Sequence, residues 1–364
     1  MTDSQKTLET WGWNDFWAAH ANELCTPPKQ AARVIGQNRN SWSLQTREGP
    51  QPGRLVSFTE HAALPVVGDW VSAEPGPSGT DPWTIQAVFP RRSQISRGSA
   101  GDGAAEQLLA ANIDKIWIVH GLDIPLNLRR LERYLAVAWE SGAVPQIILT
   151  KTDLVSEMDA IHAELSSITA GVDVYAVTME DPDSLQMLRT NLKPGTTICL
   201  IGPSGVGKST LVNAFAGEEI AQTGKVREGD HKGRHTTIRR ELFQVSGDVC
   251  LLDTPGLREL RIWLAEDGLS QTFADIESFA ANCRYTDCRH ESEPGCAVLS
   301  AVEAGQLEAG RLNSYHKLQA EAAYEHRKNN PLARAAARSR WKAIKKSLKH
   351  HPKYQSRKDD MDRK

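Results

Sequence analysis

One stretch decides the fold of this sequence: Gly202-Pro203-Ser204-Gly205-Val206-Gly207-Lys208-Ser209, directly after the apolar run Thr197–Ile201. It matches the pattern G-x-x-x-x-G-K-[ST], in which a glycine-rich turn wraps backbone N–H groups around phosphate oxygens. Helix-forming residues follow from Ser209, and the N-terminus of a helix adds partial positive charge for an anion. Strand, loop and helix in this order predict a nucleotide-binding P-loop.

The loop residues receive roles from this pattern. We expect Lys208 to reach the β- and γ-phosphates and Ser209 to be a Mg²⁺ ligand. The expected nucleotide contacts here are Gly202, Pro203, Ser204, Gly205, Val206, Gly207, Lys208, Ser209 and Thr210.

Two further segments fit the switches of a GTPase. Asp253-Thr254-Pro255-Gly256 follows an apolar run, so the acid can hold Mg²⁺ through water and the N–H of Gly256 can sense the γ-phosphate. Gly233-Arg234-His235-Thr236-Thr237 lies between this motif and the P-loop and fits the first switch. Either Thr236 or Thr237 is expected to provide a hydroxyl for Mg²⁺.

The base is expected to be read by Thr150-Lys151-Thr152-Asp153, after the apolar run Gln146–Leu149. The carboxylate of Asp153 can accept two hydrogen bonds from the N1–H and exocyclic amine of guanine. Adenine offers no such donor pair, which argues against an ATPase. The usual form is N-K-x-D, so Thr150 is a departure that could weaken the bracing of the loop.

A second base-loop motif is expected at Val177-Thr178-Met179, where GTPases usually carry S-A. Thr178 keeps the hydroxyl, whereas Met179 departs from the pattern. The base motifs therefore precede the P-loop and both switches, which is a rotation of the order in Ras-like proteins. A circular permutation preserves the packed sheet when the original termini are close. It also joins the chain after residue 264 to a switch that responds to the γ-phosphate.

The remaining pattern predicts the fold around these motifs. Strands and helices alternate from Lys115–Val119 and Leu128–Ser141 onward, which indicates a mainly parallel sheet covered by helices. Before them, short strands suit a small β-barrel such as an OB-fold. These strands are Arg33–Ile35, Trp42–Leu44, Arg54–Phe58, Asp69–Val71 and Thr84–Val88. The alternative is an unspecialised β-domain with no ligand of its own.

A cysteine-rich cluster follows the second switch: Cys283, Cys288, His290 and Cys296. Three thiolates and one imidazole form a closed tetrahedral set for structural Zn²⁺, with no open position for catalysis. The alternative is four unrelated loop residues. Cys199 and Cys250 lie in core strands, where we expect them to pack.

The C-terminus is strongly basic, since no acid interrupts the sequence between Glu325 and Asp359. Such density favours a nucleic-acid backbone as partner, against a solubilising tail or a membrane surface. The net charge of −2 over 364 residues names no partner by itself. Because we find neither a membrane-length apolar run nor a secretory signal, we expect a cytoplasmic protein without membrane contact. We also expect it to be a monomer.

Together, the permuted motifs, Gly233–Thr237, Cys283–Cys296 and the segment from Glu106-Gln107 to Asn112-Ile113-Asp114 closely resemble the ribosome small-subunit-dependent GTPase family, RsgA. The resemblance covers roughly residues 32–325. It implies an OB-fold, a permuted GTPase domain and a zinc domain in this order. It also implies a late role in small-subunit maturation, stimulation of GTP hydrolysis by that subunit, and contacts with its rRNA.

We accordingly expect five segments: an N-terminal extension 1–31, an OB-fold domain 32–95, a permuted GTPase domain 96–264, a zinc domain 265–325 and a basic tail 326–364. Ras-like enzymes place a water-positioning glutamine after the second switch, but here Leu257 stands there. We expect His235 to be the catalytic residue instead, with rRNA contact or loop packing as its alternative role, and Arg234 as another source of charge. The rival function is a GTP-dependent RNA-binding scaffold with little turnover.

Overall fold

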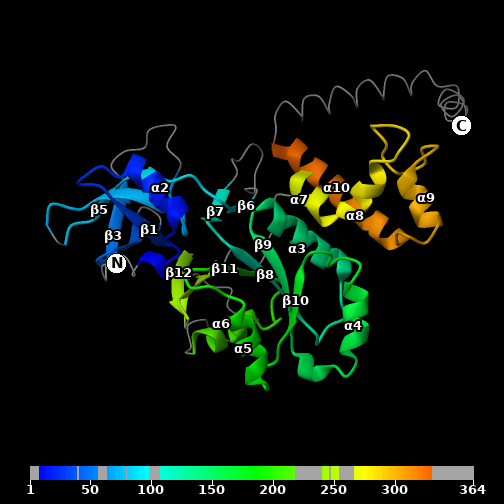
Figure 1. Ribbon diagram of the computed structural model, residues 1–364, viewed down its shortest axis with the longest axis horizontal. Helices are drawn as coiled ribbons and strands as arrows, with labels where there is room; N and C mark the ends of the chain where they lie inside the picture. The colour runs from blue at the N-terminus through cyan, green and yellow to red at the C-terminus, as the bar shows by residue number, and fades with distance from the viewer. Residues whose placement is uncertain are drawn as a thin grey trace, which may run out of the picture.

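The computed structural model describes residues 8–38, 41–55, 64–78, 80–97, 107–217, 240–245, 247–253 and 266–329. In Figure 1 a β-barrel lies at the left and a helical module at the upper right, with a central α/β unit below and between them. Among the described residues, no helix combines the length and apolar character that crossing a bilayer requires. The domain boundaries expected from the sequence stay a prediction.

The central sheet has the strand order β10-β9-β8-β11-β13-β12. Neighbours from β10 to β13 run parallel, and β12 pairs antiparallel with β13. The bounds are β8 (Lys115–Gly121), β9 (Val144–Thr150), β10 (Asp173–Ala176), β11 (Thr197–Ile201), β12 (Arg240–Val245) and β13 (Val249–Asp253). The predicted mainly parallel sheet is therefore confirmed.

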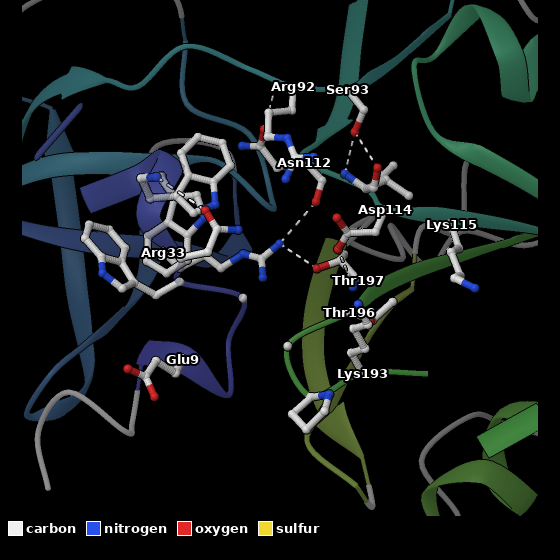
Figure 2. A pocket seen from close by; sticks show the side chains of 18 of the residues that line it. Glu9, Arg33, Arg92, Ser93, Asn112, Asp114, Lys115, Lys193, Thr196 and Thr197 are labelled. Carbon is white, nitrogen blue, oxygen red and sulfur yellow. Dashed lines mark hydrogen bonds between the residues drawn. The ribbon is translucent and has the colours of Figure 1, made fainter. Parts of the chain in front are cut away.

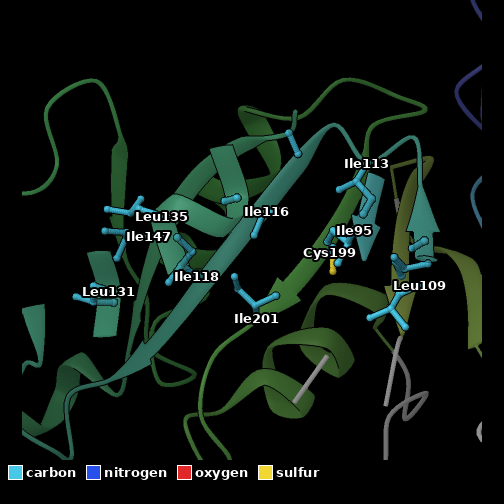
Figure 3. Close-up of a cluster of buried hydrophobic side chains, with 14 of the residues drawn as sticks. Ile95, Leu109, Ile113, Ile116, Ile118, Leu131, Leu135, Ile147, Cys199 and Ile201 are labelled. Atoms are coloured by element: carbon cyan, nitrogen blue, oxygen red, sulfur yellow. The ribbon is translucent and has the colours of Figure 1, made fainter. Parts of the chain in front are cut away.

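Helices cover both faces of this sheet because its strands alternate two apolar faces. Ile116 and Ile118 of β8 pack with α3 (Leu128–Glu140) and α4 (Met158–Leu165) (Figure 3). Trp117 points to the opposite face and meets Phe215 edge to face, with ring centroids 5.2 Å apart. That second face is covered by α5 (Pro182–Thr190) and α6 (Lys208–Ala216).

The described barrel strands run in the order β1-β2-β3-β5-β4, and β4 pairs back with β1 to close the barrel. β3 and β5 are parallel, and the other pairs are antiparallel. The bounds are β1 (Gln30–Gln37), β2 (Trp42–Thr46), β3 (Gly49–Leu55), β4 (Trp70–Glu74) and β5 (Trp83–Val88). The predicted OB-type barrel is confirmed.

The third barrel strand begins earlier than predicted, at Gly49 instead of Arg54, and residues 56–58 lie outside the described ranges. This stretch contains Pro50 and Pro52, and proline has no backbone N–H to donate to a neighbouring strand. They pair with β2 at Gln45 and Ser43, while the pairing of β3 with β5 covers only Gly53 to Leu55. The prolines thus fall where β3 has no described neighbour on its second side.

The N-terminal segment, which the sequence left without a role, packs against the barrel. Asn14 caps α2 (Asp15–Leu24) by accepting hydrogen bonds from the N–H groups of Phe16 and Trp17. Trp17 and Leu8 are buried with Trp70 of β4. A short ribbon of β6 (Gln94–Arg97) and β7 (Gln107–Ala111), which the pattern did not predict, then leads into the central sheet.

Strand pairing joins the barrel to the central sheet. Gly36 and Gln37 of β1 pair with Glu241 and Arg240 at the start of β12. The β12 strand follows the segment predicted to be the first switch. The barrel is therefore bonded directly to a strand adjoining that segment.

The helical module consists, in the described residues, of α7 (Glu266–Thr272), α8 (Ala274–Ala280), α9 (Ala297–Glu303) and α10 (Ala309–Asn329). Its apolar cluster includes Ala136 and Val137 of α3. Gly268 allows this close approach, because an added Cβ would lie 2.1 Å from the carbonyl oxygen of Ala136. The module is thus packed on the helix that follows β8.

Candidate nucleotide site and metal cluster

The predicted nucleotide-binding motifs meet at one edge of the central sheet. The P-loop follows β11, the T-K-T-D motif follows β9, Thr178 follows β10, and Asp253 ends β13. These are carboxyl ends of parallel strands, where open α/β sheets bind their ligands. The strand order therefore brings together motifs that are far apart in the sequence.

The P-loop has the backbone shape that its glycines permit. Gly202, Gly205 and Gly207 have φ values of +143°, +83° and +93°, which side chains rarely adopt. At Gly202 an added Cβ would also lie 2.3 Å from the carbonyl oxygen of Val119. Gly207 caps α6, so the loop opens directly into a helix N-terminus. Lys208 Nζ donates to the carbonyl oxygens of Gly202 (2.7 Å) and Pro203, which holds the ammonium at this loop.

Thr150 braces the P-loop instead of loosening it. Its hydroxyl is buried and donates a 2.6 Å hydrogen bond to the carbonyl oxygen of Val206. A threonine at this position, where N-K-x-D has asparagine, therefore still reaches the backbone of the P-loop.

Thr178 and Asp153 are brought together as the two base motifs require. The Thr178 hydroxyl donates to Asp153 Oδ1 over 2.7 Å, which fixes one carboxylate oxygen. Ser184 of α5 holds the backbone of Thr178, with its Oγ 3.1 Å from the carbonyl oxygen and 3.2 Å from the N–H. Ser184 was missed by the sequence analysis. Its signal was the helix start at Asp181-Pro182, which places a serine hydroxyl in the first turn.

Lys151 reaches across the site from a left-handed backbone position with φ of 59°. Its Nζ donates to Asp123 Oδ2 at 2.6 Å and to the carbonyl oxygen of Gly205 at 3.0 Å. The hydrogen bond from Lys151 holds the pKa of the Asp123 carboxyl below its usual value, which favours the ionised carboxylate. No sequence signal pointed to Asp123.

Several predicted site residues cannot be placed. Gly256, His235, Thr236 and Thr237 lie outside the described residues, as does the tail from residue 330. Asp253 is described as the last residue of β13. The roles given to all of them stay predictions.

The four predicted metal ligands gather in the helical module, with their ligand atoms all within 4.8 Å of one another. Cys283 Sγ lies 3.6 Å from His290 Nδ1 and 3.9 Å from Cys296 Sγ, and the latter two atoms are 3.3 Å apart. Ligands at ~2.3 Å from a tetrahedral ion are spaced by about 3.8 Å, so this cluster can hold a metal ion. The N–H of Leu299 donates to Cys296 Sγ at the start of α9, which supports one ligand from behind.

A cavity of about 430 Å³ lies at the other edge of the sheet (Figure 2). It is lined by the N-terminal segment, the barrel and the amino ends of β8 and β11. Arg33 crosses it and donates to the carbonyl oxygen of Asn112 (3.2 Å) and the hydroxyl of Thr197 (2.7 Å), while burial lowers its pKa. The P-loop lies at the opposite end of β11, so this cavity is separate from the nucleotide site.

The permuted sheet and its P-loop define a class, the circularly permuted P-loop GTPases. The family model described as RsgA GTPase matches residues 88–263, and a relative from Opitutus terrae is 41% identical over 351 residues, covering 93% of this chain and 96% of the relative. The chain belongs to the RsgA GTPase family and is an enzyme that hydrolyses GTP. That relative is named "Small ribosomal subunit biogenesis GTPase RsgA".

Other relatives and solved structures agree with this assignment. An RsgA 2 from Listeria monocytogenes is 43% identical over 359 residues, covering 97% of this chain and all of the relative. The crystal structure of YjeQ from Thermotoga maritima has a TM-score of 0.61 at 24% identity, covering 81% of this chain and 98% of that one. The structure titled YloQ, a circularly permuted GTPase, has a TM-score of 0.60 at 22% identity, covering 81% and 96%. These two structures share the fold of this chain.

Proposed function

We propose that this GTPase acts in late maturation of the small ribosomal subunit, binds its rRNA, and is stimulated by that subunit. The names of relatives that are about 40% identical over nearly the whole chain support this role. The observation that carries the GTP part is the bond between Thr178 and Asp153 beside the P-loop. The barrel and the helical module flank the GTPase unit on two sides, which suits a protein that contacts a large RNA surface (Figure 1).

Nucleotide recognition follows from the groups at the sheet edge. Asp153 accepts the two donors of guanine, and the stem of Lys151 lies along the base. The P-loop N–H groups and Lys208 bind the phosphates. Mg²⁺ neutralises charge on the phosphates when bound, and Ser209 with Thr236 or Thr237 would hold it, with Asp253 acting through water.

Hydrolysis requires a group that orients the attacking water. Leu257 cannot do so, and we assign this role to His235, whose imidazole can accept or donate a proton. Docking on the small subunit would bring this side chain to the phosphates, as contacts with partners control the switches of other GTPases. Arg234 is the alternative source of charge. Free turnover is accordingly slow.

The C-terminal segments serve docking in this proposal. Cys283, Cys288, His290 and Cys296 hold one structural Zn²⁺ per chain, since three thiolates and an imidazole are the ligand set that zinc prefers. The basic tail 326–364 neutralises RNA phosphates. The protein works as a cytoplasmic monomer, in the compartment of its ribosomal partner.

A single-turnover assay of GTP hydrolysis, alone and with each ribosomal subunit, tests the proposal. We expect strong stimulation by the small subunit and none by the large one. The variant His235→Ala should bind GTP and the small subunit almost normally but lose most of the stimulation. Equal slow turnover with and without subunits would favour the RNA-binding scaffold. Full stimulation of His235→Ala by the small subunit would mean that another group orients the attacking water.

A further inference from the structure

The loop between β8 and α3 contributes a carboxylate to the base site that none of the sequence motifs includes. Asp123 lies two residues after the end of β8, and Lys151 lies one residue after the end of β9. These strands are parallel neighbours, and their register ends with Gly121 opposite Thr150. The sheet therefore sets the two side chains beside each other.

The carboxylate of Asp123 lies close to the backbone at the end of β8. An added Cβ at Gly121 would lie 2.6 Å from Asp123 Oδ1 and 3.3 Å from the Cα of Val206. The carboxylate thus lies beside Gly121, at the end of β8 that is close to Val206 of the P-loop. From there its second oxygen accepts the 2.6 Å hydrogen bond from Lys151.

Lys151 needs such a partner because its side chain has four rotatable bonds. Its side chain is 32% exposed, so its ammonium competes with water for any fixed position. Holding a lysine in one rotamer costs side-chain entropy. Together, Asp123 and the carbonyl oxygen of Gly205 accept two of its three N–H donors.

We propose that Asp123 is a positioning residue for guanine nucleotide binding. It holds the ammonium of Lys151 against the P-loop carbonyl, so that the lysine stem is already in place when the base arrives. This inference rests on the proposed base-binding role of Lys151 and Asp153. Asp123 acts through Lys151 and makes no contact with the nucleotide itself.

Dissociation constants for GDP, measured on the full-length protein, test the proposal through a double-mutant cycle. The variants are Asp123→Ala, Lys151→Ala and the double variant, with Asp159→Ala as a control on the exposed start of α4. We expect Asp123→Ala to weaken GDP binding about five-fold, as suits a partly exposed ion pair. In the Lys151→Ala background the same change should have almost no effect. Asp159→Ala should leave binding unchanged.

Equal losses from Asp123→Ala in both backgrounds would overturn the proposal, because Asp123 would then act independently of Lys151. Wild-type affinity in the single variant would overturn it as well. The melting temperature of each variant without nucleotide reports any general loss of folding. A lowered melting temperature for Asp123→Ala, together with additive losses of binding, would assign Asp123 a structural role and overturn the proposal. If Asp153→Asn does not alter GDP affinity, the base site itself is misassigned and both proposals fall.

Discussion

The nucleotide site and the metal cluster of this protein are built in opposite ways. The outer two cluster residues, Cys283 and Cys296, are 13 positions apart. In the nucleotide site Thr150 bonds to Val206 over a separation of 56 positions, and Lys151 to Gly205 over 54. The cluster depends on local spacing, whereas the nucleotide site depends on which strands are neighbours. A rotation of the chain order leaves strand neighbours unchanged, so the site survives the permutation.

Loss of the metal should have the largest effect on stability. It should affect the helical module and leave the nucleotide site intact. We expect Cys288→Ala to lose the proposed zinc, because one of its four ligands is removed. Structural zinc contributes roughly 10 kcal/mol or more of binding free energy that also stabilises the fold. The helical module should then melt while the P-loop still binds GTP. Metal analysis and GTP affinity measure the two effects, with Cys25→Ala as a control outside the cluster. Zinc at wild-type stoichiometry in Cys288→Ala would contradict the ligand assignment.

The contact between α3 of the GTPase unit and the helical module should also contribute strongly to stability. Arg311 of α10 is buried and bonds to Glu132 Oε1 of α3 (2.9 Å) and to both oxygens of Asp275. Removing one partner of a buried ion pair costs about 3–5 kcal/mol, so Arg311→Ala should strongly lower the free energy of unfolding. Arg129→Ala breaks an exposed pair with Glu321 on the same two helices and should cost about 1 kcal/mol or less. Similar losses in the two variants would refute this account of the contact.

The stability of this contact should also depend on pH, and the direction of the change can be worked out. Burial already raises the pKa of Glu132, and Arg311 opposes that rise. Without Arg311 the pKa should rise further above its unfolded value. An acid whose pKa is raised in the folded state destabilises the fold fully at pH values above that pKa. This penalty shrinks as the pH falls through the folded-state pKa and is gone below the unfolded-state pKa. The stability gap between wild type and Arg311→Ala, measured by denaturant unfolding, should therefore shrink from neutral toward acidic pH.

The smallest effect on nucleotide binding is expected from substitution of Thr150. Thr150→Ala leaves the carbonyl oxygen of Val206 without this hydrogen bond, at a cost of about 1 kcal/mol. Nucleotide affinity should fall about five-fold, because the P-loop loses a brace rather than a ligand. Thr150→Ser keeps the hydroxyl and should bind almost normally. Equal affinities for Thr150→Ala and Thr150→Ser would show that the hydroxyl has no part in binding.

The features that could be predicted from the sequence are those that show as short local patterns of residues. Its P-loop, barrel strands, parallel sheet and cysteine cluster could be found because each depends on neighbouring residues. Asp123 and the buried Arg33 and Arg311 could not, since their partners lie on other elements and no spacing connects them. Ser184 was overlooked, although the helix start at Asp181-Pro182 places its hydroxyl in the first turn of α5. The early start of β3 was also missed; among the described strands its Pro50 and Pro52 pair with β2 but not with β5. The contacts of Asp123, Arg33 and Arg311 join residues far apart in the sequence, which only the packing of strands and helices brings together.

The most direct test of the permuted guanine site is the base preference of Asp153→Asn. An asparagine donates a hydrogen bond where the carboxylate accepted one, so the variant should prefer xanthosine triphosphate, whose O2 carbonyl needs a donor. Each bond to the charged group contributes roughly 1.5–3 kcal/mol, so GTP affinity should fall about ten-fold or more while affinity for xanthosine triphosphate rises. Unchanged GTP affinity in Asp153→Asn would contradict the central claim that this residue reads guanine.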